Sequence, residues 1–380
     1  MKQAAAIKIL SDLIAIPSVN GREALVADYL TQLFADYPAQ IERVEYAPGR
    51  DNLVVTIGDQ GPLLGFSGHE DVVAATPSSD WTYPPFQATF KDGKLYGRGA
   101  SDMKSGLAAM VVAMLDLLES DQPLPGRLRL LASVGEETGE YGAAQLTAAG
   151  YANDLQGLVI GEPTDLTVRI SHKGIIDYKV ESVGKSVHSS RPELGQNAIL
   201  PLLSFAEQVQ SVLAKADQID PALGGLTHVI SQIQGGEQIN SVPAHAWLTG
   251  NIRTIPAYPN ATVMQELETI VQQLNDQGAH LTLTYSYPEP PLPSQEHTAL
   301  AQLASQVLQQ KFNLSGAMVA GTGATDASEY HHVADLPIVI VGPADGVSDH
   351  QVDEFVTVAK YLRGCQFYQE LARAFWQQAN

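Results

Sequence analysis

The sequence predicts an α/β protein with a mixed, mostly parallel sheet flanked by helices and interrupted by an inserted α+β domain. Four short runs rich in valine, isoleucine and leucine, each close to a glycine, are typical of strands buried on both faces of a parallel sheet. Helical stretches alternate with such runs up to about residue 163, which favours an α/β domain. After Gly174 apolar and polar residues alternate, which indicates half-buried strands of a second, antiparallel domain.

Length and composition limit the class of protein. A chain of 380 residues favours two domains over one small core. The 22 basic and 42 acidic residues give a net charge of −20, which argues against nucleic acid or an anionic membrane surface as partner. The single cysteine, Cys365, excludes an intrachain disulfide and a cysteine-built metal site. We expect a soluble, cytoplasmic protein, because the N-terminal stretch lacks the apolar core of a signal peptide and no run reaches the roughly 18 apolar residues of a membrane span.

The first part of the chain is predicted to hold two amphipathic helices, two strands, a loop-rich stretch and one strongly apolar helix. In chain order these are 4–15, 22–36, 52–57, 63–67, 72–99 and 103–120. Pro17 marks the end of the first helix, because proline cannot continue a helix. Three prolines and three glycines between residues 72 and 99 favour loops there.

The rest of the chain is predicted to complete both domains. Residues 1–174 and 289–380 are assigned to the first domain, and 175–288 to the inserted one. The inserted domain is expected to contain two helices beside an antiparallel sheet, with PEPPLP at 288–293 as a stiff return linker. The elements expected here are strands in 175–184, 244–255 and 281–288, a helix near 197–215, a helix at 298–311, a strand at 337–342 and a final helix at 352–377.

Side chains that bind metal ions follow the apolar runs of the first domain. They are His69 and Asp71 after LLGFSG, Glu136 and Glu137 after LRLLASVG, Glu162 after GLVIG, and His350 beyond PIVIVGP. Ligands of open sheets bind beyond the carboxyl ends of the strands. Imidazole and carboxylate groups delivered to one edge of a sheet therefore predict a metal site.

The pair His69 and Asp71 forms an H-x-D motif at the end of a predicted strand. Alternate residues of a strand point the same way, so the Asp71 carboxylate is predicted to accept a hydrogen bond from the imidazole and to fix its tautomer. His69 would then be the ligand. The alternative is a histidine in an ordinary turn.

Asp102 stands at the start of the long apolar helix, in the segment LYGRGASDMKSG. A carboxylate in this place has two roles open to it. It caps the helix, or its two oxygens bridge two cations about 3.5–4 Å apart.

The adjacent carboxylates Glu136 and Glu137 repel each other, so a positive charge is expected close to them. At the transition from strand to turn both side chains can face one site, with one as ligand and the other moving a proton of the attacking water. Solvation of both on a surface loop is the alternative. Nitrogen and oxygen ligands without sulfur suit zinc, with cobalt or manganese as substitutes.

Six segments closely resemble the M20 metallopeptidase family, and together they span most of the chain. They are GHEDVV (68–73), LYGRGASDMKSG (95–106), GEETGEYG (135–142), GEPT (161–164), GKSVHSSRPELGQNA (184–198) and SDHQVDEF (348–355). The resemblance implies a zinc-peptidase-like catalytic domain with two divalent metal ions, interrupted by a lid domain that forms a homodimer. It implies hydrolysis of the amide bond of an N-acyl amino acid, with N-succinyl-diaminopimelate first and N-acetylornithine or a short peptide as alternatives.

The resemblance also assigns roles within the first domain. It places His69 and Glu162 on one metal, Glu137 and His350 on the other, and Asp102 between them as the bridge. Asp71 would orient His69, and Glu136 would be the general acid and base. The peptide bond after Asp102 is expected to be cis.

Four further residues are implied to meet the substrate. His188 would stabilise the oxyanion in the active site of a partner subunit, while Asn240 and Arg253 would bind a substrate carboxylate. Thr325 lies in GTGATDASEY (321–330), which resembles the substrate-binding loop. Desuccinylases of the family usually carry an arginine shortly after the aspartate of this loop, whereas Ser328 and Glu329 stand here. A non-catalytic small-molecule-binding protein with the same fold is the alternative from a different class.

Overall fold

The structure is a computed structural model that describes residues 1–120 and 122–378. The chain divides into two compact units. The large unit comprises Met1–Ser171, Ser294–Ala320 and Thr325–Asn380, and the inserted unit comprises His172–Pro293 and Gly321–Ala324. Each unit has its own hydrophobic core.

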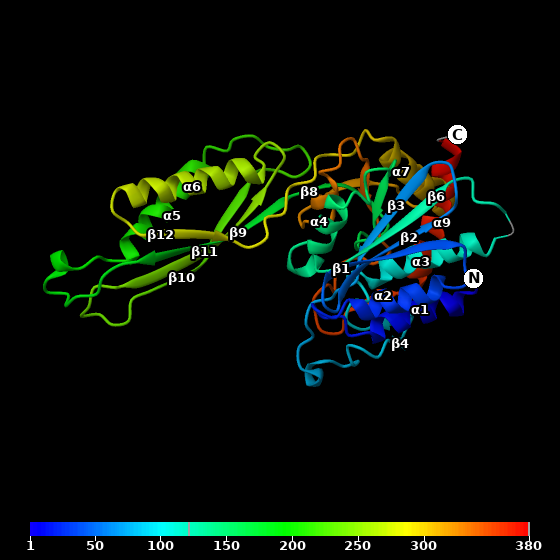
Figure 1. The fold of residues 1–380 in the computed structure, drawn as a ribbon, viewed down its shortest axis with the longest axis horizontal. Coiled ribbons are helices and arrows are strands. Elements are labelled where there is room, and N and C mark those ends of the chain that lie inside the picture. Colours follow the sequence, from blue (N-terminus) through cyan, green and yellow to red (C-terminus); the bar gives the residue numbers. More distant parts are fainter. Residues whose placement is uncertain (121, 379–380) are drawn as a thin grey trace. The chain divides into compact units, whose positions relative to one another are not determined.

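The large unit is built on an eight-stranded sheet with the strand order β1-β2-β6-β3-β7-β14-β8-β13. Figure 1 labels its strands β1, β2, β3, β6 and β8. These strands are β1 (Ala39–Ala47), β2 (Arg50–Ile57), β3 (Leu63–His69), β6 (Arg127–Ser133), β7 (Leu158–Ile160), β8 (Val168–His172), β13 (Met318–Gly321) and β14 (Ile338–Ile340). The four central strands, β6, β3, β7 and β14, run parallel. β1 pairs antiparallel with β2, β2 with β6, and β8 with β14. The predicted fold class, a mixed sheet with a parallel centre, is confirmed.

Helices cover both faces of this sheet. They are α1 (Gln3–Ala15), α2 (Ala24–Phe34), α3 (Lys104–Leu118), α4 (Tyr141–Ala148), α7 (Ala299–Phe312), α8 (Ala327–Tyr330) and α9 (Val358–Gln378). Leu128 and Leu130 of β6 lie in the core with α3. Arg129 between them donates to the main-chain oxygen of Tyr151 beyond α4, so α4 lies over the opposite face. In the part of the chain that the structure describes, no helix is both long and apolar enough to cross a bilayer.

A small three-stranded sheet corrects two predictions. It consists of β4 (Thr89–Lys91), β5 (Lys94–Tyr96) and β15 (Phe355–Thr357) in the order β15-β5-β4. The stretch 72–99 is therefore not loop throughout. Asp92 and Gly93, both with positive φ, form the two-residue hairpin turn between β4 and β5. The last helix begins at Val358 rather than at 352, because residues 355–357 pair with β5.

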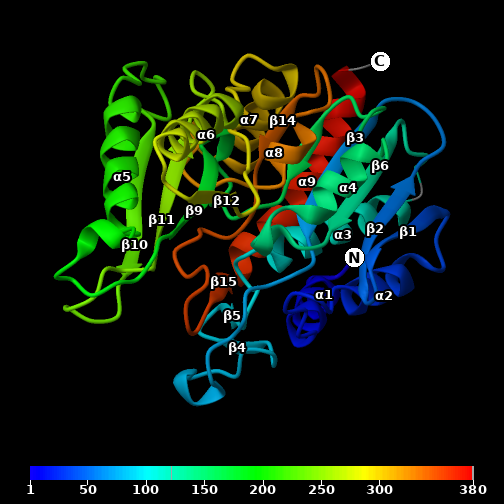
Figure 2. The same cartoon turned by 60° about the vertical axis from the view of Figure 1, so that its left-hand side comes forward.

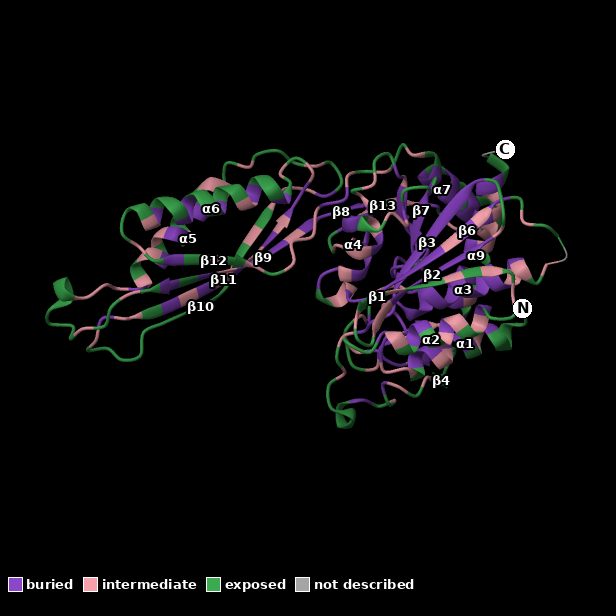
Figure 3. Ribbon diagram, in the orientation of Figure 1, coloured by how far each residue is buried: buried purple, intermediate pink, exposed green. Residues whose placement is uncertain are grey.

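The inserted unit is a four-stranded antiparallel sheet with two helices on one face (Figure 2). Its strands are β9 (Gly174–Val183), β10 (Thr227–Gly235), β11 (His245–Thr254) and β12 (Leu281–Tyr285), and its long helices are α5 (Ile199–Leu213) and α6 (Asn260–Asp276). Buried and more exposed residues alternate along β9 and β11 (Figure 3). Short 3-10 turns lie at Ser78–Asp80 and Glu136–Thr138 in the large unit and at Pro192–Leu194 in the inserted unit.

Candidate metal centre

The predicted ligands lie beyond the carboxyl ends of the four central parallel strands. His69 is the last residue of β3, Glu136 and Glu137 follow β6, Glu162 follows β7, and His350 lies in the loop after β14. Parallel strands end at the same edge of a sheet, which brings these side chains together. Asp102 joins them from the loop that precedes α3.

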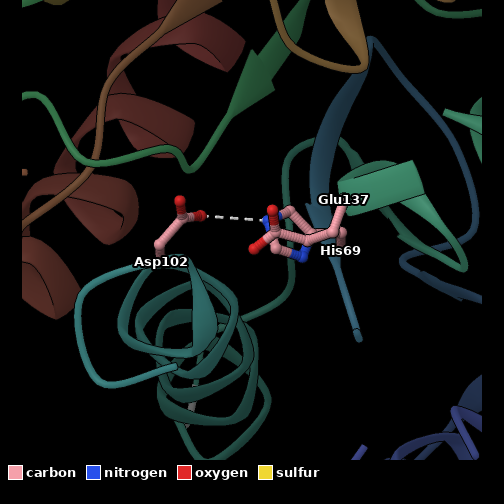
Figure 4. Close-up of side chains that lie close together, drawn as sticks. All are labelled: His69, Asp102 and Glu137. Atoms are coloured by element: carbon pink, nitrogen blue, oxygen red, sulfur yellow. Dashed lines mark hydrogen bonds and ion pairs between the residues drawn. The ribbon is translucent and has the colours of Figure 1, made fainter. Parts of the chain in front are cut away.

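His69 is fully buried, and its two ring nitrogens have different surroundings. Nδ1 lies 2.9 Å from the main-chain oxygen of Asp71 and 3.6 Å from its carboxylate Oδ1. The main-chain oxygen of Asp71 is the nearer partner of Nδ1, and the Asp71 carboxylate lies within ion-pair distance of the same nitrogen. With the proton on Nδ1, Nε2 is left as the ligand atom. Nε2 lies 3.1 Å from Oδ1 of Asp102 (Figure 4).

The Asp71 carboxylate also holds the turn after β6. Its oxygens accept hydrogen bonds from the main-chain N–H groups of Gly135 at 2.9 Å, Glu136 at 3.2 Å and Glu137 at 3.1 Å. Strand β3 ends at His69, so Asp71 lies just beyond the strand. Burial raises the pKa of Asp71 to about 6.

Asp102 lies between the two histidines. Its Oδ1 is 3.1 Å from Nε2 of His69, and its Oδ2 is 3.2 Å from Nε2 of His350. Although burial opposes ionisation, hydrogen bonds to His350 and His69 hold the pKa of Asp102 below its ordinary value. The peptide bond from Asp102 to Met103 is cis, which confirms that prediction.

Glu137 and His350 form the second half of the cluster. Nε2 of His350 lies 3.0 Å from Oε2 and 3.1 Å from Oε1 of Glu137. Hydrogen bonds to Asp102 and Glu137 raise the pKa of His350 to about 10.

Glu162 and Glu136 complete the surroundings of His69. Nε2 of His69 is 3.6 Å from Oε1 of Glu162 and 3.9 Å from Oε2 of Glu136. Burial raises the pKa of both glutamates well above the ordinary value. Although burial lowers the pKa of His69, the hydrogen bond to Asp102 and the nearby carboxylates raise it well above its ordinary value.

These side chains fit divalent cations. Within residues 1–120 and 122–378, four carboxylates of the cluster form ion pairs with histidines and with no lysine or arginine. They are Asp102, Glu136, Glu137 and Glu162. Oε1 of Glu162 is buried and accepts no hydrogen bond from any described residue, although it lies 3.6 Å from Nε2 of His69. One ligand atom each from His69, Asp102 and Glu137 lies within 4.8 Å of the others. Cations among these atoms would balance the carboxylates and give Glu162 a partner.

The predicted substrate residues are distributed over both units. His188 is exposed, with Nδ1 2.8 Å from Oγ of Ser190, and the main-chain oxygen of Asn240 accepts from the N–H of Ser189. The loops of His188 and Asn240 are thus neighbours within the inserted unit.

Arg253 lies on β11 of the same unit, and its Nε donates to the side-chain oxygen of Asn251 at 3.3 Å. Thr325 belongs to the large unit, where it is buried and its hydroxyl accepts from the N–H of Ala327 at 3.2 Å.

Two further buried carboxylates lie near the candidate ligands: Asp326, in the loop already identified from the sequence, and Glu354, which sequence reasoning missed. The Ser133 hydroxyl donates to Oδ2 of Asp326, whose Oδ1 has no hydrogen-bond partner among the described residues. Glu354 accepts hydrogen bonds from the loop that carries Asp102. The available signal was its place in SDHQVDEF, one of the family-like segments.

Comparison with known proteins agrees with this geometry. The chain is 34% identical over 395 residues to "Probable succinyl-diaminopimelate desuccinylase" of Staphylococcus epidermidis, with 97% of each chain covered. Its fold is similar to that of an M20 family metallo-carboxypeptidase from Sulfolobus solfataricus, with a TM-score of 0.79 at 17% identity, covering 98% of this chain and 99% of the other. It is also similar to a dinuclear metal binding peptidase from Bacillus subtilis, with a TM-score of 0.70 at 17% identity and 99% and 98% of the two chains covered.

The family itself is identified from the sequence. Residues 65–374 match peptidase family M20/M25/M40, which is most of the chain and includes every candidate ligand described above. The match, the near full-length relative and the arrangement of the ligands agree on one class of enzyme. The chain belongs to peptidase family M20/M25/M40 and is a metal-dependent hydrolase.

Proposed function

We propose that this protein hydrolyses the amide bond of an N-acyl amino acid with the aid of two zinc ions. The observation that carries the proposal is the position of Asp102, whose two oxygens each face a different histidine, His69 and His350. His69 and Glu162 would hold one ion, Glu137 and His350 the other. When bound, the ions would polarise the substrate carbonyl and acidify the attacking water.

Glu136 is the proposed general base and acid. Its carboxylate stands beside the ligands, 3.9 Å from Nε2 of His69, and makes no closer ion pair among the described residues. Burial raises its pKa, and a raised carboxyl pKa suits a group that takes a proton near neutral pH. Glu136 would accept the proton of the attacking water and pass a proton to the leaving amine.

N-succinyl-diaminopimelate is the proposed substrate, with succinate and diaminopimelate as products. The name of the relative at 34% identity supports this choice. The loop after Asp326 favours a second candidate, because Ser328 and Glu329 supply no positive charge where desuccinylases of the family usually carry arginine. An N-acyl amino acid without the second succinyl carboxylate, such as N-acetylornithine, or a short peptide would need no such arginine.

The inserted unit is the proposed lid and dimerisation domain. β10 is an edge strand of its sheet and exposes Val229 and Ile233, which are 59% and 56% accessible. The neighbouring helix α5 exposes Leu200 and Leu203. Unpaired strand edges with apolar side chains favour pairing with another chain. By the resemblance to the family, His188 of such a homodimer would serve the partner's active site.

A substrate panel tests the proposal. The zinc-loaded protein is assayed for release of free amine from N-succinyl-diaminopimelate, N-acetylornithine, other N-acyl amino acids and dipeptides. Rapid release from the succinyl compound supports the proposed substrate, and release from another member alone moves the activity to that substrate. Absence of hydrolysis across the panel, with both ions bound, would favour the binding-protein alternative.

A further inference from the structure

Glu354 is a fully buried side chain outside the proposed ligand set, yet it contacts the loop that carries Asp102. Its Oε1 accepts hydrogen bonds from the main-chain N–H groups of Ser101 at 2.8 Å and Asp102 at 3.0 Å. Its Oε2 accepts from the N–H of Gly99 at 3.1 Å and from Nη1 of Arg98 at 2.6 Å. All four partners donate, so both oxygens act as acceptors, as in an ionised carboxylate.

The same contacts connect this loop to the segment that carries His350. Glu354 lies four residues after His350. Arg98 directs its second nitrogen, Nη2, to the main-chain oxygen of His350 at 3.3 Å. The Ser101 hydroxyl donates to Oδ1 of Asp349. Several hydrogen bonds therefore connect the loop before α3 with the loop after β14. They lie close to Asp102 and His350, the ligands that these loops carry.

We propose that Glu354 is a positioning residue that fixes the Asp102 carboxylate relative to His350 and so sets the separation of the two metal positions. The inference rests on the proposed function only in that divalent ions occupy these positions. Asp102 has to face two histidines at once, and a displacement of its main chain would change both distances together. Removal of a hydrogen bond that orients a metal ligand typically weakens metal affinity by about 10–100-fold.

A merely structural role for Glu354 makes a different prediction. The buried pair of Arg98 and Glu354 would then stabilise the fold without affecting the metal positions. Removal of one partner of a buried pair lowers stability in either case. Only a positioning role predicts that a folded variant without the Glu354 carboxylate also binds the metal ions more weakly.

The test compares Glu354→Gln with the unaltered protein. Glutamine keeps the size of the side chain but replaces one accepting oxygen with an NH2 group. That group cannot accept hydrogen bonds from the N–H donors that face it. We expect about 10–100-fold weaker binding of both zinc ions, measured by competition with a chelator. Binding should recover at high zinc concentration. Glu370→Gln is the matched control, because the ion-pair partners of Glu370 among the described residues are Arg373 and Lys311, both outside the ligand loops. The zinc affinity of this variant should stay unchanged.

Unchanged zinc affinity in folded Glu354→Gln would overturn the inference, even if its melting temperature in EDTA is lower. Failure of the unaltered protein to bind two ions would instead overturn the proposed function. If Glu354→Gln does not fold, Glu354→Asp replaces it, because aspartate keeps the charge but its shorter side chain moves the accepting oxygens away from these N–H groups. Weaker zinc binding by folded Glu354→Asp is expected, and unchanged zinc affinity would contradict the positioning role.

Discussion

Glu136 is the residue whose role separates catalysis from metal binding. Glu136→Gln should retain both metal ions, because the side chain is outside the proposed ligand set, and should lower kcat by at least about 100-fold through loss of proton transfer. Metal content and steady-state kinetics measure the two effects separately. Turnover equal to that of the unaltered enzyme would remove Glu136 from the mechanism.

His350 links pH to the stability of the metal-free protein. Its hydrogen bonds raise its pKa to about 10 in the folded chain, above the ordinary 6.5, so the folded state holds the proton more strongly. This contribution is complete below about pH 6.5 and is lost as the pH rises through about 10. In EDTA, the melting temperature should therefore fall between these pH values, and His350→Gln should show a smaller fall. Equal falls in both proteins would contradict the assignment.

The sequence predicted the ligands of the metal centre better than the contacts that hold them. His69, Glu137 and Glu162 each follow an apolar run, and strand topology alone brings such positions to one edge. The hydrogen bond from His69 to the main-chain oxygen of Asp71 was not predictable, because it depends on the residue at which β3 ends. Glu354 was missed because three of its four partners are main-chain N–H groups, so that only its place in the family-like segment SDHQVDEF pointed to it.

At the scale of elements, the close packing of α3 on the chain after β7 supports the site. A Cβ atom added at Gly106 would lie 1.9 Å from the main-chain oxygen of Gly161, next to Glu162. Gly106→Ala should therefore lower the free energy of unfolding by about 1–3 kcal/mol or more, measured by denaturant titration. Gly225→Ala is the control, since nothing lies within 4 Å of its added Cβ. Equal stabilities for the two variants would show that α3 has room to move.

Long helices were predicted more accurately than short strands, because the periodic pattern of apolar residues extends over more of the chain. The helices α1, α3 and α7 lie within two residues of the predicted ranges at each end, because several turns of periodicity define them. Strands β4, β5 and β15 have three residues each, too few to show alternation. β10 was missed because Val229 and Ile233 are exposed, so its apolar residues do not mark a buried face.

At the scale of the whole molecule, the proposed dimer depends on the exposed edge of the inserted unit. Val229→Lys places a charge on edge strand β10 and should convert the dimer to monomer, as measured by sedimentation velocity. Ile219→Lys is the matched control, because Ile219 is 73% exposed and lies outside this edge strand. A dimer that persists in Val229→Lys would exclude β10 as the interface.

The most direct test of a dinuclear metal site is the number of metal ions that one chain holds. The purified protein, loaded with zinc and freed of excess metal, is analysed for zinc per chain beside Asp102→Ala. Asp102 contacts both histidines, so we predict two ions in the unaltered protein and weakened binding of both in the variant. One ion or none in the unaltered protein, or two tightly bound ions in Asp102→Ala, would contradict a site bridged by Asp102.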